Sequence, residues 1–203
     1  MSRILVVGDG VIGRCVAYFC ARRGHEVRVL ERGAEGHDGC SFGNAGMVVP
    51  SHFIPLAAPG VPARALRWMV DSTSPFYIRP RLSVELFRWT WEFYRACTPA
   101  RLERAVKLLR DLGVMSRQLF DELAGDLDDF RLTRRGLLML CKSQSTLREE
   151  AEVAALAKAL GISAVVLTPD EVAVLDPAVQ MDVACGVHFE QDCHLVPHEF
   201  MAA

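Results

Sequence analysis

RILVVGDGVIGRC, residues 3–15, is the stretch that decides the fold of this 203-residue chain. Its apolar run, Ile4–Val7, is typical of a strand in a parallel sheet, where both faces are covered. Apolar residues at helical spacing over Val11–Arg23, followed by Gly24, predict a helix that ends at a glycine. The segment HEVRVLER that follows predicts a second strand, Glu26–Leu30. The three elements together form a β-α-β unit.

The glycines between the first strand and the helix form a G-x-G-x-x-G pattern. Gly8 permits a tight turn, Gly10 lets the backbone approach a pyrophosphate, and Gly13 lets the helix pack against the strand. The start of the helix offers N–H groups and the positive end of its dipole to phosphate. Glu31 follows the second strand and is placed to bind ribose hydroxyls, which makes the 2′-phosphate of NADP a poor fit. The pattern predicts a dinucleotide site; the alternative is a glycine-rich turn that binds nothing.

One residue of this turn conflicts with the chemistry of such a site. Asp9 places a negative side chain beside the expected position of the pyrophosphate. That charge would be unfavourable if the side chain pointed inward, so we expect it to point away. The β-α-β unit by itself does not discriminate FAD from NAD.

Composition is that of a soluble globular protein, with 51% hydrophobic and 24% charged residues. A formal net charge of −2 does not indicate the basic surface that nucleic-acid-binding proteins use. The seven cysteines show no C-x-x-C pair and no zinc-like spacing, so we expect reduced thiols and no metal site. No apolar run reaches the roughly 18 residues of a membrane span, and the N-terminus does not resemble a signal peptide. We therefore expect a cytoplasmic protein, with contact at the inner face of the membrane as a further option.

Beyond the β-α-β unit the chain passes from a loop to helices, and then to mixed helices and strands. Residues 33–62 are rich in glycine and proline, and an irregular segment of this length is usually functional. The predicted elements are helices at 63–70, 81–97 and 99–123, a strand at 136–143, a helix at 146–161, a strand at 164–167, a short helix capped by Thr168, and a strand within 184–197. Pro197 is placed to start a last helix, and since the chain ends inside it we expect a truncated product.

The predicted helix at 81–97 carries an apolar and strongly aromatic face. That face consists of Leu82, Leu86, Trp89 and Phe93, with Phe87, Trp91 and Tyr94 beside it and Arg81, Arg88 and Arg95 at its flanks. We expect a helix buried in the core. The alternative is a helix that lies on a membrane surface.

The segment after the second strand, ERGAEGHDGCSFGNAGMVVPSHFIPLAAPGVP, favours FAD over NAD. Glu31-Arg32, Ser41, Asn44-Ala45-Gly46, and then PLAAPGVP and RWM resemble the N-terminal half of the bacterial D-amino acid dehydrogenase family. Those enzymes belong to the glycine oxidase and D-amino acid oxidase class of FAD proteins. The segments RWTWEF, GLLML, LDPAV and CGVHFEQDCHLVPHEF extend the resemblance along the whole chain, although the family's chains are much longer.

The resemblance implies a set of cofactor contacts. These residues are Gly8, Gly10, Val11, Ile12 and Gly13 at the pyrophosphate, Glu31 and Arg32 at the adenosine, and Ser41, Asn44, Ala45, Gly46 and Met47 from the pyrophosphate to the flavin ring. The small residues Ala45 and Gly46 would let the backbone lie close to a flat ring. Cys40 departs from the family, which more often has threonine, so a hydroxyl contact is not available there.

The resemblance also implies a reaction. The α C–H of an amino acid delivers a hydride to the flavin, and water hydrolyses the resulting imine to a 2-oxo acid. The cofactor carries the difficult step while the protein orients the substrate, so no catalytic side chain is assigned. His52 is the candidate for a substrate contact because it follows the flavin segment closely; the alternative is a loop histidine in solvent. A quinone is one candidate electron acceptor, and oxygen is the other.

The expected fold class is α/β. A Rossmann-like FAD-binding domain, incomplete, would comprise 1–60 and 186–203, and an inserted α+β substrate domain would comprise 61–185. Three functions stay open: oxidation of a D-amino acid (or of glycine, proline or hydroxyproline) with FAD, a non-catalytic fragment that does not retain FAD, and an NAD-dependent dehydrogenase. An unfinished apolar surface predicts a homo-oligomer or aggregation.

Overall fold

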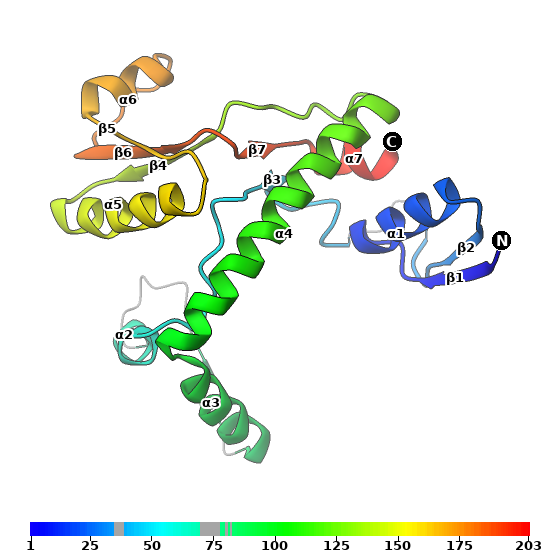
Figure 1. Ribbon diagram of the computed structural model, residues 1–203, viewed down its shortest axis with the longest axis horizontal. Helices are drawn as coiled ribbons and strands as arrows, with labels where there is room; N and C mark the ends of the chain where they lie inside the picture. The colour runs from blue at the N-terminus through cyan, green and yellow to red at the C-terminus, as the bar shows by residue number, and fades with distance from the viewer. Residues whose placement is uncertain (35–38, 70–77, 80, 82) are drawn as a thin grey trace.

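A computed structural model describes residues 1–34, 39–69, 78–79, 81 and 83–203 of the chain (Figure 1). Its elements are β1 (Arg3–Val7), α1 (Val11–Arg22), β2 (Glu26–Leu30), β3 (Met47–Val48), α2 (Val61–Trp68), α3 (Val84–Ala96), α4 (Pro99–Asp126), β4 (Leu137–Cys141), α5 (Gln144–Ala159), β5 (Val165–Leu167), α6 (Pro169–Leu175), β6 (Cys185–Phe189), β7 (Cys193–His194) and α7 (Pro197–Ala202). The order follows the sequence prediction with two additions: β3 lies inside the segment expected to be a loop, and the single strand expected within 184–197 is two strands, β6 and β7. Thr168 and Glu171 form a capping box at the start of α6, as the sequence indicates.

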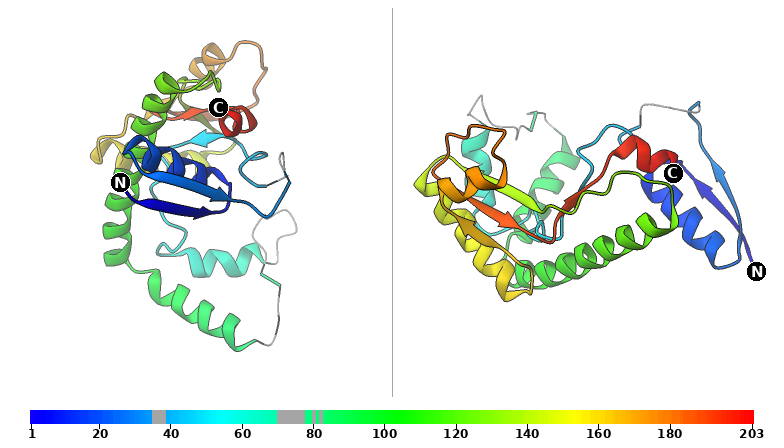
Figure 2. Two further views of the ribbon diagram at one scale, coloured as in Figure 1. Left: turned by 90° about the vertical axis from the view of Figure 1, so that its right-hand side faces the viewer. Right: turned by 90° about the horizontal axis from the view of Figure 1, so that it is seen from above.

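The predicted β-α-β unit is present at the N-terminus. β1 and β2 pair in parallel from Arg3 opposite Glu26 onward, and α1 lies along one face of the pair (Figure 2). A Cβ at Gly13 would overlap the carbonyl oxygen of Gly8, so this glycine permits the close approach of helix and strand. The expectation that both faces are covered is wrong for the described residues, since Leu5 is 59% and Val7 81% exposed. The apolar run predicts the strand but not the partner that covers its second face.

A three-stranded antiparallel sheet with the order β4-β6-β5 forms the other end of the molecule. A Cβ at Gly186 would press on Val172 of α6, whereas the neighbouring Val187 belongs to a core cluster with Ala154 and Ala157 of α5. Successive residues of a strand point to opposite faces, so α5 and α6 cover opposite sides of this sheet (Figure 1). The expected return to an FAD-binding domain near 186 falls inside β6, which is paired on both sides. The division into domains stays a prediction.

Helix α4 joins the two ends of the molecule (Figure 1). Its Val106 lies in the core cluster around Phe53 and Val187, and its Leu123 lies in a second cluster with Phe130 and Leu195. The side chains of Val106 and Leu123 are both almost fully buried. The helix therefore links the three-stranded sheet to the end of the molecule that carries the β-α-β unit.

The chain returns to the N-terminal unit through a short antiparallel pair. β3 and β7 pair with Met47 opposite His194 and Val48 opposite Cys193. After β7, helix α7 begins at Pro197 as predicted and lies close to α1, because Arg14 donates a hydrogen bond to the carbonyl oxygen of Met201. Because the chain returns in this way, the segment after β2, the middle of α4 and the start of α7 lie close together and border one pocket (Figures 1 and 2).

The prediction of a buried aromatic helix is wrong. No described side chain of α3 is buried, and Phe87, Trp91 and Tyr94 are 75%, 55% and 60% exposed. Leu82, which belongs to the predicted apolar face, lies outside the described residues. Of the predicted face itself, Leu86 and Phe93 are half-buried and Trp89 is 47% exposed. The aromatic rings stack on one another within the helix, Trp89 on Phe93 and Trp91 on Tyr94.

Candidate functional site

The start of α1 is built to receive an anion. Gly8 has a φ of +104° and donates its N–H to the carbonyl oxygen of Leu30 at 2.7 Å, which closes the turn against β2. Gly10 is the N-cap of α1 and supplies no side-chain cap, and the first turn contains no acidic residue. The N–H of Val11 donates instead to Ser41 Oγ at 3.0 Å. A backbone amide, a hydroxyl and the positive end of the helix therefore converge at one point.

Glu31 lies against the glycine-rich turn, as the β-α-β geometry predicts. Its carboxylate accepts the N–H of Asp9 at 2.8 Å through Oε2. Its Oε1 accepts the N–H groups of Arg32 and Gly33 at 2.8 and 2.9 Å. These bonds orient the carboxylate at the carboxyl end of β2, beside the turn. The Arg32 residue is exposed at the same edge.

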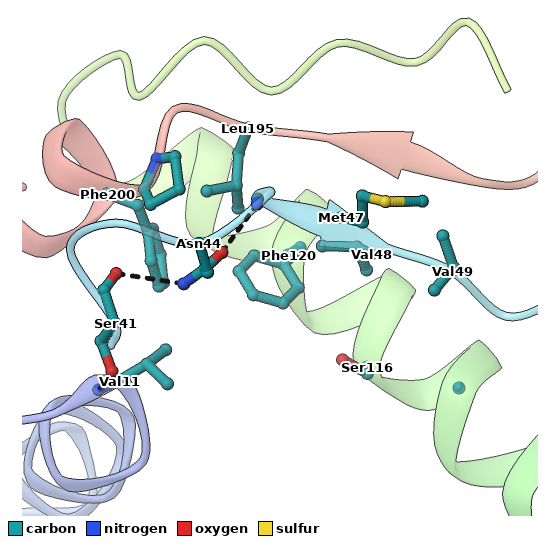
Figure 3. A pocket seen from close by; sticks show the side chains of 13 residues that line it. Val11, Ser41, Asn44, Met47, Val48, Val49, Ser116, Phe120, Leu195 and Phe200 are labelled. Carbon is teal, nitrogen blue, oxygen red and sulfur yellow. Dashed lines mark hydrogen bonds between the residues drawn. The ribbon is translucent and has the colours of Figure 1, made fainter. Parts of the chain in front are cut away.

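The segment 41–47 is held in shape by its own amide side chain (Figure 3). Asn44 donates to the carbonyl oxygens of Cys40 and Ser41 at 3.1 and 3.3 Å and accepts the N–H of Gly46 at 2.7 Å. Gly46 has a φ of +63°, and a Cβ there would overlap the carbonyl oxygen of Leu195. Leu195 in turn donates its N–H to the carbonyl oxygen of Gly46 at 2.9 Å. Within the described structure Asn44 shapes the segment rather than reaching across the pocket.

A pocket of about 360 Å³ lies between this segment, α1 and α4 (Figure 3). Of the residues predicted from the sequence it brings together Val11, Ser41, Asn44, Gly46 and Met47. The remaining predicted residues lie outside its lining: Gly8, Gly10, Ile12, Gly13, Glu31, Arg32 and Ala45. The glycine turn adjoins the pocket through the hydrogen bond from Val11 to Ser41. Glu31 adjoins the turn through the hydrogen bond that its carboxylate accepts from the N–H of Asp9. The side chain of Ile12 is 78% exposed, so only its backbone is available to a ligand at the turn.

Several residues of the pocket were missed by the sequence analysis. Those beyond the 41–49 segment are Gly113, Ser116 and Phe120 of α4 together with Leu195, Pro197 and Phe200. Only Gly113 carries a sequence signal, because glycine is costly inside a helix. A Cβ at this position would lie 3.0 Å from the Cα of Pro50, so the glycine lets α4 approach the chain after β3.

His52, the candidate substrate contact, does not line this pocket. It is exposed, and its Nδ1 lies 3.2 Å from Ser51 Oγ. It borders a separate pocket of about 170 Å³ together with Met139 and Glu150. The substrate contact of His52 stays a prediction.

Beside His52 lies a buried carboxylate that the sequence did not single out. Asp192 is 1% exposed and accepts the Ser51 N–H at 3.1 Å and the Ser51 hydroxyl at 2.5 Å. Burial raises the pKa of Asp192 above its ordinary value, while the two bonds from Ser51 act in the opposite direction. The pair joins the chain after β3 to the turn between β6 and β7.

All seven cysteines are free thiols. Cys141 and Cys185 lie opposite each other in the β4–β6 pair, and burial together with this neighbour raises the pKa of Cys141 to about 11. Within the described residues, no three His, Cys, Asp or Glu side chains gather as a metal site would require. None of the described helices has the length and apolar character of a membrane span.

Comparison with known proteins places the chain in a family. Residues 3–203 match the DAO family, described as FAD dependent oxidoreductase. A D-amino acid dehydrogenase of Granulibacter bethesdensis is 35% identical over 185 residues, which cover 88% of this chain and 43% of the relative. A D-amino acid dehydrogenase of Cereibacter sphaeroides is 36% identical over 179 residues, which cover 88% of this chain and 41% of the relative.

A solved structure shares the fold along the whole chain. Glycine oxidase from Geobacillus kaustophilus superposes with a TM-score of 0.66 at 20% identity, covering 100% of this chain and 43% of that protein. The chain spans less than half the length of these relatives. The resemblance drawn from the sequence motifs is confirmed, and so is the α/β class of the fold. With the match running from the first strand to the last helix, the protein belongs to the FAD dependent oxidoreductase family.

Proposed function

We propose that this chain binds FAD along the glycine turn and segment 41–47, as part of an enzyme that oxidises a D-amino acid. The observation that carries the proposal is the convergence of the Val11 N–H and the Ser41 hydroxyl beside Gly10. A Cβ at Gly10 would lie 3.3 Å from Ser41 Oγ and fill the space beside them. The residues present therefore fit a pyrophosphate, and the 360 Å³ pocket continues from Ser41 toward Met47, where a flat ring would lie.

Each group of residues has a distinct part in this proposal. The Ser41 hydroxyl accepts from Val11 and keeps its own proton, which it can donate to a phosphate oxygen. The N–H of Ile12, above the turn of Gly8, Gly10 and Gly13, binds another phosphate oxygen, while the N–H of Val11 holds Ser41 in place. Glu31 and Arg32 bind the adenosine. The backbone of Ala45, Gly46 and Met47 borders the ring, opposite the apolar side chains that α4 and α7 contribute.

The reaction follows from the family. When bound, FAD supplies the hydride acceptor. The substrate's α C–H bond breaks with its electron pair, the amine nitrogen loses a proton, and water hydrolyses the imine to a 2-oxo acid and ammonia. The protein's part is to orient the α-carbon of the substrate. The substrate class rests on relatives that are named D-amino acid dehydrogenase.

We further propose that the electron acceptor is a quinone and that the protein works at the cytoplasmic face of a membrane. The support is α3, whose exposed aromatic rings include Phe87, Trp91 and Tyr94. Arg88 and Arg95 lie on the same helix and would favour an anionic surface. A second copy of the chain is proposed to cover the open face of β1, where Leu5 and Val7 are exposed.

The experiment for the cofactor is a visible absorption spectrum of the purified chain before and after addition of FAD and desalting. A retained flavin spectrum supports the proposal, and a parallel titration with NAD tests the dehydrogenase alternative. A chain that stays colourless is the outcome expected of a fragment that does not retain FAD, and it contradicts the proposal. Light scattering on the same samples reports whether the chain self-associates.

The substrate is tested separately on the flavin-loaded protein. D-alanine, glycine, L-proline and L-alanine are added without oxygen, and the flavin absorbance is followed. Bleaching by D-alanine but not by L-alanine supports the proposed substrate class. Bleaching only by glycine or proline would keep the FAD site and change the substrate.

A further inference from the structure

The acidic residue of the glycine turn has a partner that the sequence did not reveal. Asp9 lies between the two glycines at the point where the proposed pyrophosphate approaches the backbone. Its own N–H is fixed to Glu31, and the N–H of Gly8 is fixed to Leu30. The backbone of Asp9 is therefore held in place, and only rotation of its side chain decides where the negative charge lies.

Arg14, in the first half of α1, holds that side chain. Its Nε donates to Asp9 Oδ1 at 2.7 Å and its Nη2 donates to Asp9 Oδ2, so the guanidinium binds both carboxylate oxygens. Planar two-point contacts of this kind are among the strong charge-assisted hydrogen bonds. The Asp9 side chain is 23% exposed and that of Arg14 is 40% exposed, so water screens the pair only in part.

Two further contacts fix the position of the Arg14 guanidinium. Its Nη1 donates to the carbonyl oxygen of Met201 in α7. Its central carbon, Cζ, lies 5.7 Å from the centre of the ring of Phe42, the residue that follows Ser41. The guanidinium thus spans the glycine turn, the segment that carries Ser41 and the last helix. A side chain held from three elements is preorganised to bind Asp9 in one orientation.

We propose that Arg14 is a positioning residue that neutralises Asp9 and holds its carboxylate away from the pyrophosphate site. The turn then accepts a diphosphate although its second residue is acidic. Without Arg14, the freed Asp9 charge lies beside the phosphates and, together with Glu31, opposes a dianionic ligand. This inference rests on the proposed FAD site, and it assigns the two residues a role that the G-x-G-x-x-G pattern does not contain.

The test compares wild type with Arg14→Met, Asp9→Asn and the double variant Asp9→Asn/Arg14→Met. Binding of FAD is measured by flavin fluorescence and binding of ADP by calorimetry. Adenosine, which lacks phosphate, is the control ligand. We expect Arg14→Met to weaken FAD and ADP by about ten-fold or more and to leave adenosine unchanged. The double variant regains most of the wild-type affinity, because the charge that Arg14 neutralises is gone.

Other outcomes distinguish this inference from the proposed function. If Arg14→Met and the double variant lose affinity equally, Arg14 acts through Met201 and Phe42, and the inference is wrong. Unchanged binding in Arg14→Met overturns it while the FAD site stands. A wild-type chain that binds neither FAD nor ADP overturns both. Arg14→Lys keeps the charge and loses the two-point contact, so its affinity should lie between those of wild type and Arg14→Met. Thermal melts of the unliganded proteins show whether each variant is folded.

Discussion

The hydroxyl oxygen of Ser41 accepts the N–H of Val11 at 3.0 Å and thereby caps a helix that has no cap of its own. The bond joins the start of α1 to the segment after β2, and these two places are separated in the chain by α1 and β2. Because Gly10 has no side chain, the hydroxyl and the amide stand side by side without obstruction. The shape of the proposed pyrophosphate site therefore depends on a residue far from the glycine pattern.

Replacing Ser41 with Ala should lower the affinity for FAD about ten-fold, since one hydrogen bond to a charged phosphate is lost. The helix also loses its cap, at a cost of about 1 kcal/mol in the free energy of unfolding. Fluorescence titration and urea unfolding measure the two effects. Ser145→Ala on α5, whose hydroxyl contacts only Ser143 among the hydrogen bonds described, serves as the control and should change neither. Equal FAD affinity in Ser41→Ala and wild type would show that the Ser41 hydroxyl does not bind FAD.

Gly46→Ala should lower the free energy of unfolding by about 3 kcal/mol, because the residue has a positive φ and no room for a Cβ. The displaced Leu195 would also break the contact between the 41–47 segment and the chain after β7. Gly43→Ala in the same segment has no heavy atom within 4 Å of the added Cβ and is the matched control. Urea denaturation of both variants gives the comparison, and similar stabilities would contradict the described packing.

Two glycines of α4 should respond in opposite directions to alanine. Gly125→Ala adds a Cβ into open space and should stabilise the helix by about 0.5–1 kcal/mol. Gly113→Ala places its Cβ 3.0 Å from the Cα of Pro50, so the helix must move and the propensity gain is lost. Unfolding free energies should therefore rise in the first variant and fall in the second. A gain in both would show that α4 does not pack closely on Pro50.

Asp192 should make the protein more stable as the pH falls. Burial raises its folded-state pKa above the ordinary value of 3.8, so the folded state binds the proton more tightly than the unfolded state. The penalty of the buried charge is complete above the raised pKa and is relieved as the pH falls through it toward 3.8. Asp121 and Glu171, whose pKa values are lowered, act in the opposite direction.

The pH effect of Asp192 is isolated by comparison with Asp192→Asn, which carries no titrating group. Unfolding free energies of the two proteins are measured by urea at several pH values in the acidic range. The difference, wild type minus variant, should increase as the pH is lowered through the raised pKa of Asp192. A difference that is flat or decreases would show that the Ser51 bonds outweigh the burial.

The exposed aromatic face of α3 should affect membrane binding and not stability. Phe87→Ser and Trp91→Ser should reduce co-sedimentation with anionic lipid vesicles, while the free energy of unfolding changes by less than about 0.5 kcal/mol. Val174→Ser on α6, an exposed apolar residue of another helix, is the matched control and should leave vesicle binding intact. Vesicle binding that survives both aromatic substitutions would contradict the membrane proposal.

The prediction for α3 failed for a physical reason. An amphipathic pattern shows that one face of a helix avoids water, but it carries no information about what covers that face. The same holds for β1, whose continuous apolar run predicts a strand while Leu5 and Val7 remain exposed in the described structure. Periodicity is a property of neighbouring residues, whereas burial is a property of the whole assembly.

The sequence by itself determined the β-α-β unit, the glycine turn, the start of α6 at Thr168 and the family to which the motifs point. These features depend on local backbone preferences, capping and short spacings, which are written in consecutive residues. Only the tertiary structure decided that Ser41 caps α1, that Arg14 holds Asp9, and that Gly113 brings α4 against Pro50. The first and the last of these join segments far apart in the sequence, and Arg14, although it lies near Asp9 in the chain, is fixed from a distance by Met201 of α7 and by Phe42.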